Sequence, residues 1–263
     1  MKNVLLIGIG GVYNYGCEAI VRGTVNILKS INPEIKISYA SYNYNDDVKR
    51  LSGCDIRIVE RSRPRRWSLR NITRKFLSLF GITNIFSYDS TDWLGNYDTV
   101  FSIGGDIYTL CHNGTYDVSL PLFLEKCQAR GIKYILWGAS VGKFEKNSKA
   151  LTFFKKHLKK IDLIVAREFV TVDYLKSLGV VQNVVFAPDP AYFVECPSLN
   201  KLKKKSSQIC IGINLSPLSS LYHYDNMEIA IAKQTEAICG LARLLDCKFL
   251  FLPHVLAHSK MDN

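Results

Sequence analysis

The sequence contains no apolar run that approaches the roughly 20 residues of a membrane-spanning helix. The apolar run near the N-terminus, VLLIGI, is shorter than a signal-peptide core and no small-residue cleavage site follows it. The eight cysteines form no CxxC pair and no cysteine–histidine pair at metal-site spacing. We therefore expect a cytoplasmic protein without a transmembrane segment, a structural metal or disulfides.

Acidic residues are missing from one segment that is rich in basic ones. The 263-residue chain has a formal net charge of +11, and residues 61–76 (RSRPRRWSLRNITRKF) hold seven Lys or Arg residues and no acid. A second basic run, KLKKK, occupies 201–205. Such clusters favour an anionic partner or else form a solvated loop surface. They lack any recognised nucleic-acid-binding module, so nucleic acid is not the expected partner.

Apolar runs and amphipathic segments alternate along most of the chain. Strands are predicted at 3–9, 35–42, 98–105, 133–140, 162–167 and 183–190. Helices are predicted at 17–31, 117–131, 147–161 and 168–179. Near-continuous apolar strands separated by amphipathic helices indicate a parallel sheet with helices on both faces. The predicted class is therefore α/β, with a Rossmann-like parallel sheet.

The charged stretch 196–208 interrupts this alternation and is typical of a linker. It separates an N-terminal domain, 1–195, from a second α/β unit, 209–263. In that unit we expect strands at 209–216 and 248–255 and a helix at 225–246. Because two strands and one helix cannot cover their own sheet, we expect the second domain to be truncated. The alternative is that it extends the first domain.

The glycine-rich turn GIGGVYNYG, residues 8–16, lacks the features of a dinucleotide-binding turn. Tyr13 stands where G-x-G-x-x-G requires its third glycine. No Asp or Glu ends the next strand, where the ribose carboxylate is needed, and no Walker lysine follows the turn. The turn therefore does not predict binding of NAD or a nucleoside triphosphate.

Small polar, aromatic and charged residues follow the predicted strands at their carboxyl ends. The segments are YNYGCE (13–18), SIGGDIY (102–108), WGASVGKF (137–144), AREF (166–169), PDPAYF (188–193) and NLSP (214–217). In open α/β sheets ligands bind beyond this edge. Turn chemistry explains any one of these residues, but no rule of folding requires Trp137, Arg167 and Asp106 at one edge.

The chain resembles the polysaccharide pyruvyl transferase family in a series of motifs that occur in the family's order. They are YNYGCEAIVRGT, SIGGDIY, LWGASVGKF, LIVAREFVTVDYLKSLGV, APDPAYF and IGINLSP. Each motif alone is weak, but together they are specific and extend over most of the chain. Two positions depart from the family pattern: Cys17 stands where Asp is frequent, and Thr171 replaces a frequent Ser.

This resemblance implies a GT-B-like arrangement of two domains. It also implies transfer of a pyruvyl group from phosphoenolpyruvate to two hydroxyls of a sugar. The product would be a cyclic ketal on a cell-surface polysaccharide, such as a capsule or exopolysaccharide, or on its lipid-linked precursor. Phosphoenolpyruvate is then a donor substrate, and neither a cofactor nor a metal is expected. The donor-site arginine of the family corresponds to Arg167, and His254 is a second donor-binding candidate whose alternative is a structural histidine.

The residue types at this edge suit the implied chemistry. Phosphoenolpyruvate bears a carboxylate and a phosphate, and arginine recognises planar oxyanions better than lysine does. A general base must accept a proton from the sugar hydroxyl, and Asp106 and Glu18 are the catalytic candidates. Their structural alternatives are a turn residue for Asp106 and a partner of the helix dipole for Glu18.

Candidates for binding the acceptor lie in the same segments: Asn14, Gly104, Gly105, Trp137 and Ser140. Trp137 could stack on a sugar ring or belong to the core. A lipid diphosphate-linked acceptor would also give residues 61–76 a role, because cations interleaved with Trp and Leu suit peripheral contact with the anionic inner face of a membrane.

Two other classes of function stay open on the sequence alone. A glycosyltransferase with a nucleotide-sugar donor would use the same architecture. A non-catalytic fragment would bind the saccharide without releasing phosphate from phosphoenolpyruvate.

Overall fold

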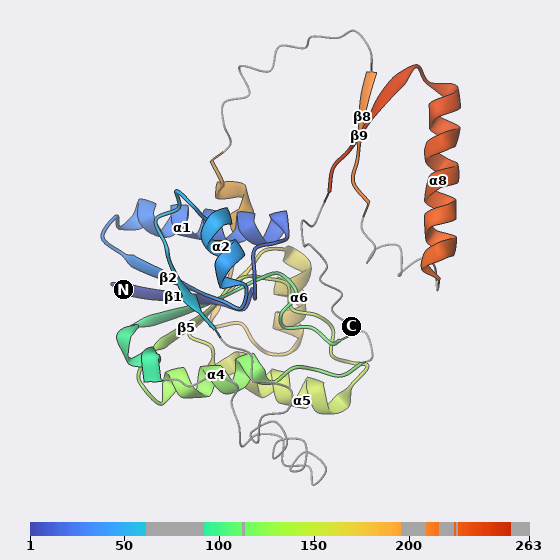
Figure 1. The fold of residues 1–263 in the computed structure, drawn as a ribbon. Coiled ribbons are helices and arrows are strands. Elements are labelled where there is room, and N and C mark those ends of the chain that lie inside the picture. The colour runs from blue at the N-terminus through green and yellow to red at the C-terminus, as the bar shows by residue number, and fades with distance from the viewer. Residues whose placement is uncertain (62–91, 112–113, 196–208, 216–223, 225, 254–263) are drawn as a thin grey trace, which may run out of the picture. The chain divides into compact units, whose positions relative to one another are not determined.

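The computed structural model describes residues 1–61, 92–111, 114–195, 209–215, 224 and 226–253. The chain divides into two compact units, Met1–Val194 and Glu195–Asn263 (Figure 1). His254, the predicted linker and all but the first residue of the basic segment 61–76 lie outside the described residues.

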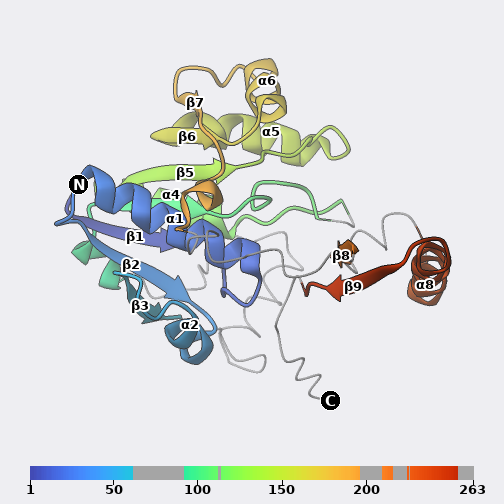
Figure 2. The same ribbon diagram turned by 90° about the horizontal axis from the view of Figure 1, so that it is seen from above.

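The strands of the first unit form one seven-stranded parallel sheet (Figure 2). They are β1 (Asn3–Ile7), β2 (Lys36–Ser41), β3 (Arg57–Glu60), β4 (Thr99–Ile103), β5 (Lys133–Ala139), β6 (Leu163–Ala166) and β7 (Val184–Phe186). Their order is β3-β2-β1-β4-β5-β6-β7, so the strand order reverses between β1 and β4. Ligands of open α/β sheets bind at such a switch point, beyond the carboxyl ends of the strands.

Helices cover both faces of this sheet (Figure 1). Among the residues described, the helices of this unit are α1 (Tyr15–Ile31), α2 (Tyr44–Arg50), α4 (Ser119–Gln128), α5 (Ser148–His157) and α6 (Phe169–Ser177), with short 3₁₀ helices η1 (Asp92–Asn96), η2 (Leu158–Lys160) and η3 (Pro190–Phe193). One apolar core joins the sheet to α4, α5 and α6, and the other joins it to α1. The predicted α/β, Rossmann-like class is confirmed.

Within the part of the chain that the structure describes, no helix has the length and apolar character needed to cross a membrane.

Helix α1 begins two residues before its predicted start at 17 and ends at Ile31, as predicted. Asn14 caps it, because its Oδ1 accepts a hydrogen bond from the Gly16 amide at 2.8 Å. Its buried residues recur at helical spacing and pack on the sheet; they include Ile20, Val21, Val25 and Leu28. The helix ends before Asn32-Pro33, where proline cannot continue it.

Two glycines allow η3 to approach the rest of the first unit closely. A Cβ at Gly23, in α1, would lie 1.8 Å from the carbonyl oxygen of Pro190. A Cβ at Gly138, in β5, would lie 2.6 Å from Pro190 Cδ, and Gly138 has a φ of +64°. Since neither position has room for a side chain, η3 packs directly on α1 and on the end of β5. This contact fixes the place of Asp189, which precedes η3.

The core beside α5 contains a buried histidine. His157 is 4% exposed, and its Nε2 lies 3.1 Å from the hydroxyl of Tyr108. The two rings stack with their centroids 5.6 Å apart. Burial, with a smaller contribution from the charge of Lys160, lowers the pKa of His157 from 6.5 to about 4. The imidazole is therefore neutral at pH 7 and packs as a core side chain.

We expect the first unit to lose stability as the pH falls from 6.5 to about 4. The unfolded chain gains a proton on this histidine below pH 6.5, whereas the folded unit gains it only near pH 4. The contribution of His157 is therefore fully present above pH 6.5 and is lost as the pH falls through 4, at a cost of about 3 kcal/mol.

The variant His157→Gln keeps a hydrogen-bonding side chain but does not titrate. It should flatten this part of the curve of unfolding free energy against pH, measured by urea denaturation. An identical pH dependence in the variant and the unmodified protein would contradict this assignment.

The described part of the second unit contains two parallel strands and the helix between them: β8 (Ile209–Ile213), α8 (Met227–Leu244) and β9 (Cys247–Phe251). Asn226 caps α8, because its Oδ1 accepts from the Glu228 amide at 2.7 Å. Strand, helix and strand follow one another as the apolar pattern predicts.

Two elements of the first unit escape the sequence patterns. The edge strand β3 has only four residues, RIVE, with a charge at each end, so its apolar signal is short. Helix α2, YNDDVKR, has no apolar face. Packing against the rest of the unit, rather than a periodic apolar pattern of their own, therefore stabilises β3 and α2.

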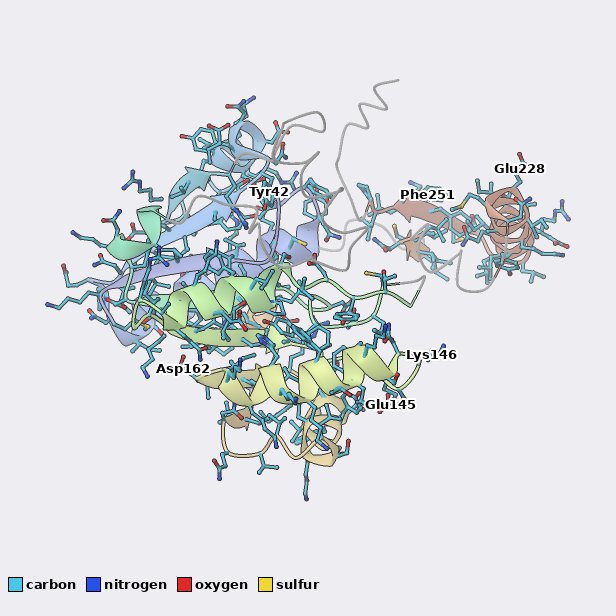
Figure 3. All side chains as sticks on the ribbon, turned by 90° about the horizontal axis from the view of Figure 1, so that it is seen from below. Tyr42, Glu145, Lys146, Asp162, Glu228 and Phe251 are labelled. Carbon is cyan, nitrogen blue, oxygen red and sulfur yellow. The ribbon has the colours of Figure 1, made fainter. Side chains whose placement is uncertain are left out.

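The labelled side chains distinguish the edge at which the strands begin from the edge at which they end (Figure 3). Asp162 lies at the edge where the strands begin, and its Oδ2 accepts from the Tyr134 amide at 2.9 Å. Glu145 and Lys146 lie at the other end of the α5 layer. This second edge is the one at which the strands end and at which the predicted site residues gather.

Candidate active site

Three connections at the carboxyl edge meet at the side chain of Arg167, which follows β6. Its Nε donates to Ser140 Oγ, after β5, at 2.9 Å. Its Nη1 donates to Asp189 Oδ2 at 2.8 Å, and its Nη2 donates to Asp106 Oδ1 at 3.2 Å. The guanidinium therefore links the segments that follow β4, β5 and β7.

The guanidinium of Arg167 lies against the backbone of Gly105. A Cβ at Gly105 would be 2.4 Å from Nη2 and 2.7 Å from Nη1. The carbonyl of Gly105 also accepts a hydrogen bond from the Ser140 amide at 2.8 Å. Gly105 is thus needed for the position of Arg167, while its role in acceptor binding stays a prediction.

At position 104 the backbone conformation, rather than a close contact with Arg167, requires glycine. Its φ of +123° is a conformation that other residues rarely adopt. A Cβ there would lie 3.3 Å from Ile9 Cγ1, so the loop after β4 lies against the loop after β1. The structure thus joins the two loops at the switch point, and the predicted acceptor contact of Gly104 is untested.

Asp189 belongs to this cluster; the sequence places it at the same edge, but its position between two prolines favours a structural role. Its Oδ1 caps η3 by accepting from the Ala191 amide at 2.8 Å, and its Oδ2 accepts from Arg167. An aspartate between two prolines is typical of a turn. No local pattern distinguishes such a turn from one whose carboxylate also binds a distant arginine.

Thr171 supports the loop after β5. Its Oγ1 accepts from the Val141 amide at 3.3 Å and donates to Glu168 Oε1 at 3.0 Å. A serine hydroxyl has the same donor and acceptor, so threonine at this position keeps the hydrogen-bonding group.

The loop after β1 is held by a buried carboxylate from α2. Asp47 Oδ1 accepts from the Val12 amide at 3.0 Å, and Oδ2 accepts from Ser41 Oγ at 2.5 Å. The residue has no exposed surface. The first buried acid after β2 thus binds the backbone of the glycine-rich loop itself.

Glu18 lies between two arginines near the start of α1. It accepts a hydrogen bond from Arg22 Nε at 2.9 Å and forms an ion pair with Arg50 Nη2 at 3.0 Å. The guanidinium of Arg50 also lies 5.3 Å from the centre of the Tyr15 ring. These contacts tie α1 to the end of α2, and the role of Glu18 as a general base stays a prediction.

Trp137 packs against the core on the α1 side of the sheet. Its ring meets Phe101 edge to face, with centroids 5.3 Å apart. Its Nε1 is buried and has no hydrogen-bond partner among the described residues. The side chain therefore contributes to the core, and stacking on a sugar ring is untested.

Residues 14–245 match the model of one protein family, polysaccharide pyruvyl transferase. The chain belongs to this family. The match confirms the resemblance carried by the sequence motifs and makes the protein a transferase of polysaccharide biosynthesis. No curated protein matches it significantly.

The pyruvyl transferase is also similar to solved structures of Anabaena HepE. The complex of HepE with UDP and glucose has a TM-score of 0.54 at 11% identity, covering 95% of this chain and 69% of HepE. The complex with UDP-glucose has a TM-score of 0.51 at 12% identity, covering 96% and 69%. At such low identity the likeness shows the fold alone, which is Rossmann-like and GT-B-like.

Cys17 of the pyruvyl transferase is a partly buried thiol next to the α1 core. Burial, followed by the negative charge of Asp47, raises the pKa of this thiol. Cys17 is therefore protonated at neutral pH and packs as a small apolar residue.

Six of the predicted site residues of the pyruvyl transferase fall into two groups. Asp106, Gly105, Ser140 and Arg167 lie together at the ends of β4, β5 and β6. Asn14 and Glu18 lie at the start of α1, where both have structural contacts. Among the residues described, no three His, Cys, Asp or Glu side chains are arranged to hold a metal ion.

Proposed function

We propose that this pyruvyl transferase moves the pyruvyl group of phosphoenolpyruvate onto two hydroxyls of a sugar and forms a cyclic ketal. The observation that supports the proposal is the position of Arg167. Its guanidinium is held by three different connections at the carboxyl edge of the sheet. A fixed planar cation suits the carboxylate and phosphate of phosphoenolpyruvate, which present pairs of oxygens to it.

The proposed reaction balances without a cofactor. The methylene carbon of phosphoenolpyruvate gains a proton and becomes a methyl group, and one sugar hydroxyl bonds to the central carbon. The bond from that carbon to the phosphate oxygen breaks, and the second hydroxyl closes the ring. Of the two hydroxyl protons, one balances the new methyl group and the other leaves on phosphate.

Asp106 is the residue best placed to act as the general base. It contacts Arg167, and its side chain is 79% exposed, so an acceptor hydroxyl can reach it from solvent. The carboxylate of Glu18 is engaged by Arg22 and Arg50. We therefore propose Asp106 for the proton transfer and keep Glu18 as the second candidate. A contribution of His254 to donor binding is also a proposal.

The fold offers one alternative donor. HepE, which has a similar fold, was solved with UDP, glucose and UDP-glucose. A glycosyltransferase reaction with a nucleotide sugar would use the same architecture, whereas a saccharide-binding protein would use no donor at all.

Donor binding and phosphate release separate these functions. We expect phosphoenolpyruvate, but not UDP-glucose, to raise the melting temperature of the protein. We also expect phosphate release from phosphoenolpyruvate when a panel of free and lipid-linked sugars is supplied. Stabilisation by UDP-glucose alone would favour the glycosyltransferase. Saccharide binding without phosphate release, for every sugar tested, would favour the binding protein.

A further inference from the structure

The charge around Arg167 conflicts with the binding of an anionic donor. One guanidinium is in contact with two carboxylates, those of Asp106 and Asp189. Phosphoenolpyruvate would bring further negative charge to this cluster, and like charges at contact distance repel. Release of one of the two carboxylates would lower this repulsion and free a further N–H of Arg167 for the donor.

Asp189 is not the carboxylate that can leave. Its side chain is 20% exposed and lies 2.8 Å from Arg167 Nη1. Its other oxygen caps η3 through the Ala191 amide. Because η3 packs on the glycines of α1 and β5, moving this carboxylate would require moving the whole segment.

Asp106 differs from Asp189 in its exposure and in the length of its contact with Arg167. Its side chain is 79% exposed, and its contact with Arg167 Nη2 is longer, at 3.2 Å. An exposed ion pair of this kind contributes little, because water and salt screen it. Rotation of this side chain into solvent leaves the backbone of the loop in place.

We propose that the two carboxylates divide their work: Asp189 is a positioning residue that holds Arg167 throughout, while Asp106 releases Nη2 to an oxyanion of the donor. This inference rests on the proposed function and adds to it the order in which donor binding and proton transfer occur. Donor binding frees the Asp106 carboxylate from its ion pair, and the freed carboxylate then accepts the proton of the acceptor hydroxyl as that oxygen bonds to the donor carbon. Donor binding thus raises the fraction of molecules in which this base is free of its ion pair.

Two asparagine variants test this division because they should change donor affinity in opposite directions. Binding of phosphoenolpyruvate without acceptor is measured by calorimetry. Asp106→Asn removes the competing anion, so we expect binding to tighten about two- to fivefold, the range for an exposed ion pair. Asp189→Asn keeps an oxygen that can cap η3 but removes the charge that orients Arg167, so we expect binding to weaken about tenfold.

Kinetics provide the second measurement. For Asp106→Asn we expect KM for the donor to fall together with kcat, because the base is lost. For Asp189→Asn we expect mainly a higher KM. A purely structural role of Asp189 would lower the melting temperature without this split between KM and kcat.

The outcomes distinguish this inference from the proposed function. If the unmodified protein binds no phosphoenolpyruvate, both fail. If it binds the donor through Arg167 but Asp106→Asn does not tighten binding, or Asp189→Asn does not weaken it, only the division between the two carboxylates is wrong.

Discussion

Replacing Arg167 with alanine should lower phosphate release from phosphoenolpyruvate by about a hundredfold or more. The guanidinium is the cation that three strand ends hold at the proposed donor site. Its loss removes the planar pair of donors for the oxyanions and leaves the carboxylates of Asp106 and Asp189 without their cation. Both effects weaken binding of an anion, and the rate is measured by a coupled phosphate assay.

Two further variants show whether geometry or charge matters. Arg167→Lys keeps the charge but not the paired N–H groups, so we expect an activity between those of the alanine variant and the unmodified protein. Arg130→Ala removes the same charge at an exposed position after α4, where Arg130 Nη1 donates to the Lys126 carbonyl at 3.3 Å. This control should retain full activity. Equal activity of Arg167→Ala and the unmodified protein would remove Arg167 from the donor site.

The largest expected effect on stability comes from replacing Gly23 with alanine. The new methyl group would lie 1.8 Å from the carbonyl oxygen of Pro190, a backbone atom that cannot rotate away. Helix α1 and η3 would have to separate, and the lost packing should lower the free energy of unfolding of the first unit by about 3 kcal/mol. The measurement is urea denaturation followed by circular dichroism.

Gly240 in α8 is a suitable control for this substitution. It is also a helical glycine, but a Cβ there meets no atom within 4 Å beyond its chain neighbours and the backbone of its own helix. Alanine favours helix over glycine by up to about 1 kcal/mol, so Gly240→Ala should be neutral or stabilising. If Gly23→Ala proved as stable as the unmodified protein, η3 would not be packed on α1 as described. The position of Asp189 would then need revision as well.

The local patterns predict most of the fold. Apolar runs with helical or alternating periodicity mark β1, β4, β5 and α1, and each of these lies within two residues of its predicted start. The end of helix α1 is the clearest case, since Asn32-Pro33 marks it, whereas its cap at Asn14 is not predicted. Because the prediction depends on apolar periodicity, it misses α2, which has no apolar face, and β3, whose apolar run is very short.

The candidate site is predictable only in part. The sequence points to Arg167, Asp106 and Ser140 because they follow strands of a parallel sheet, and those ends meet at one edge. It does not show that Asp189 pairs with Arg167, nor that Glu18 pairs with Arg22 and Arg50. The sequence around a carboxylate in a turn or a first helical turn is the same whether or not the carboxylate forms an ion pair with a residue distant in the chain.

Periodicity, capping residues and ordered motifs are properties of neighbouring residues, and they are enough to establish the α/β class and the pyruvyl transferase family. Which side chains pair at the carboxyl edge of the sheet depends instead on their distances in the folded chain. Arg167 meets Asp189 and Asp106 across 22 and 61 residues of chain, and only the packing of η3 and the glycine at 105 brings these side chains together. Which carboxylate is fixed and which is exposed therefore follows from the folded structure, because burial depends on segments far apart in the sequence.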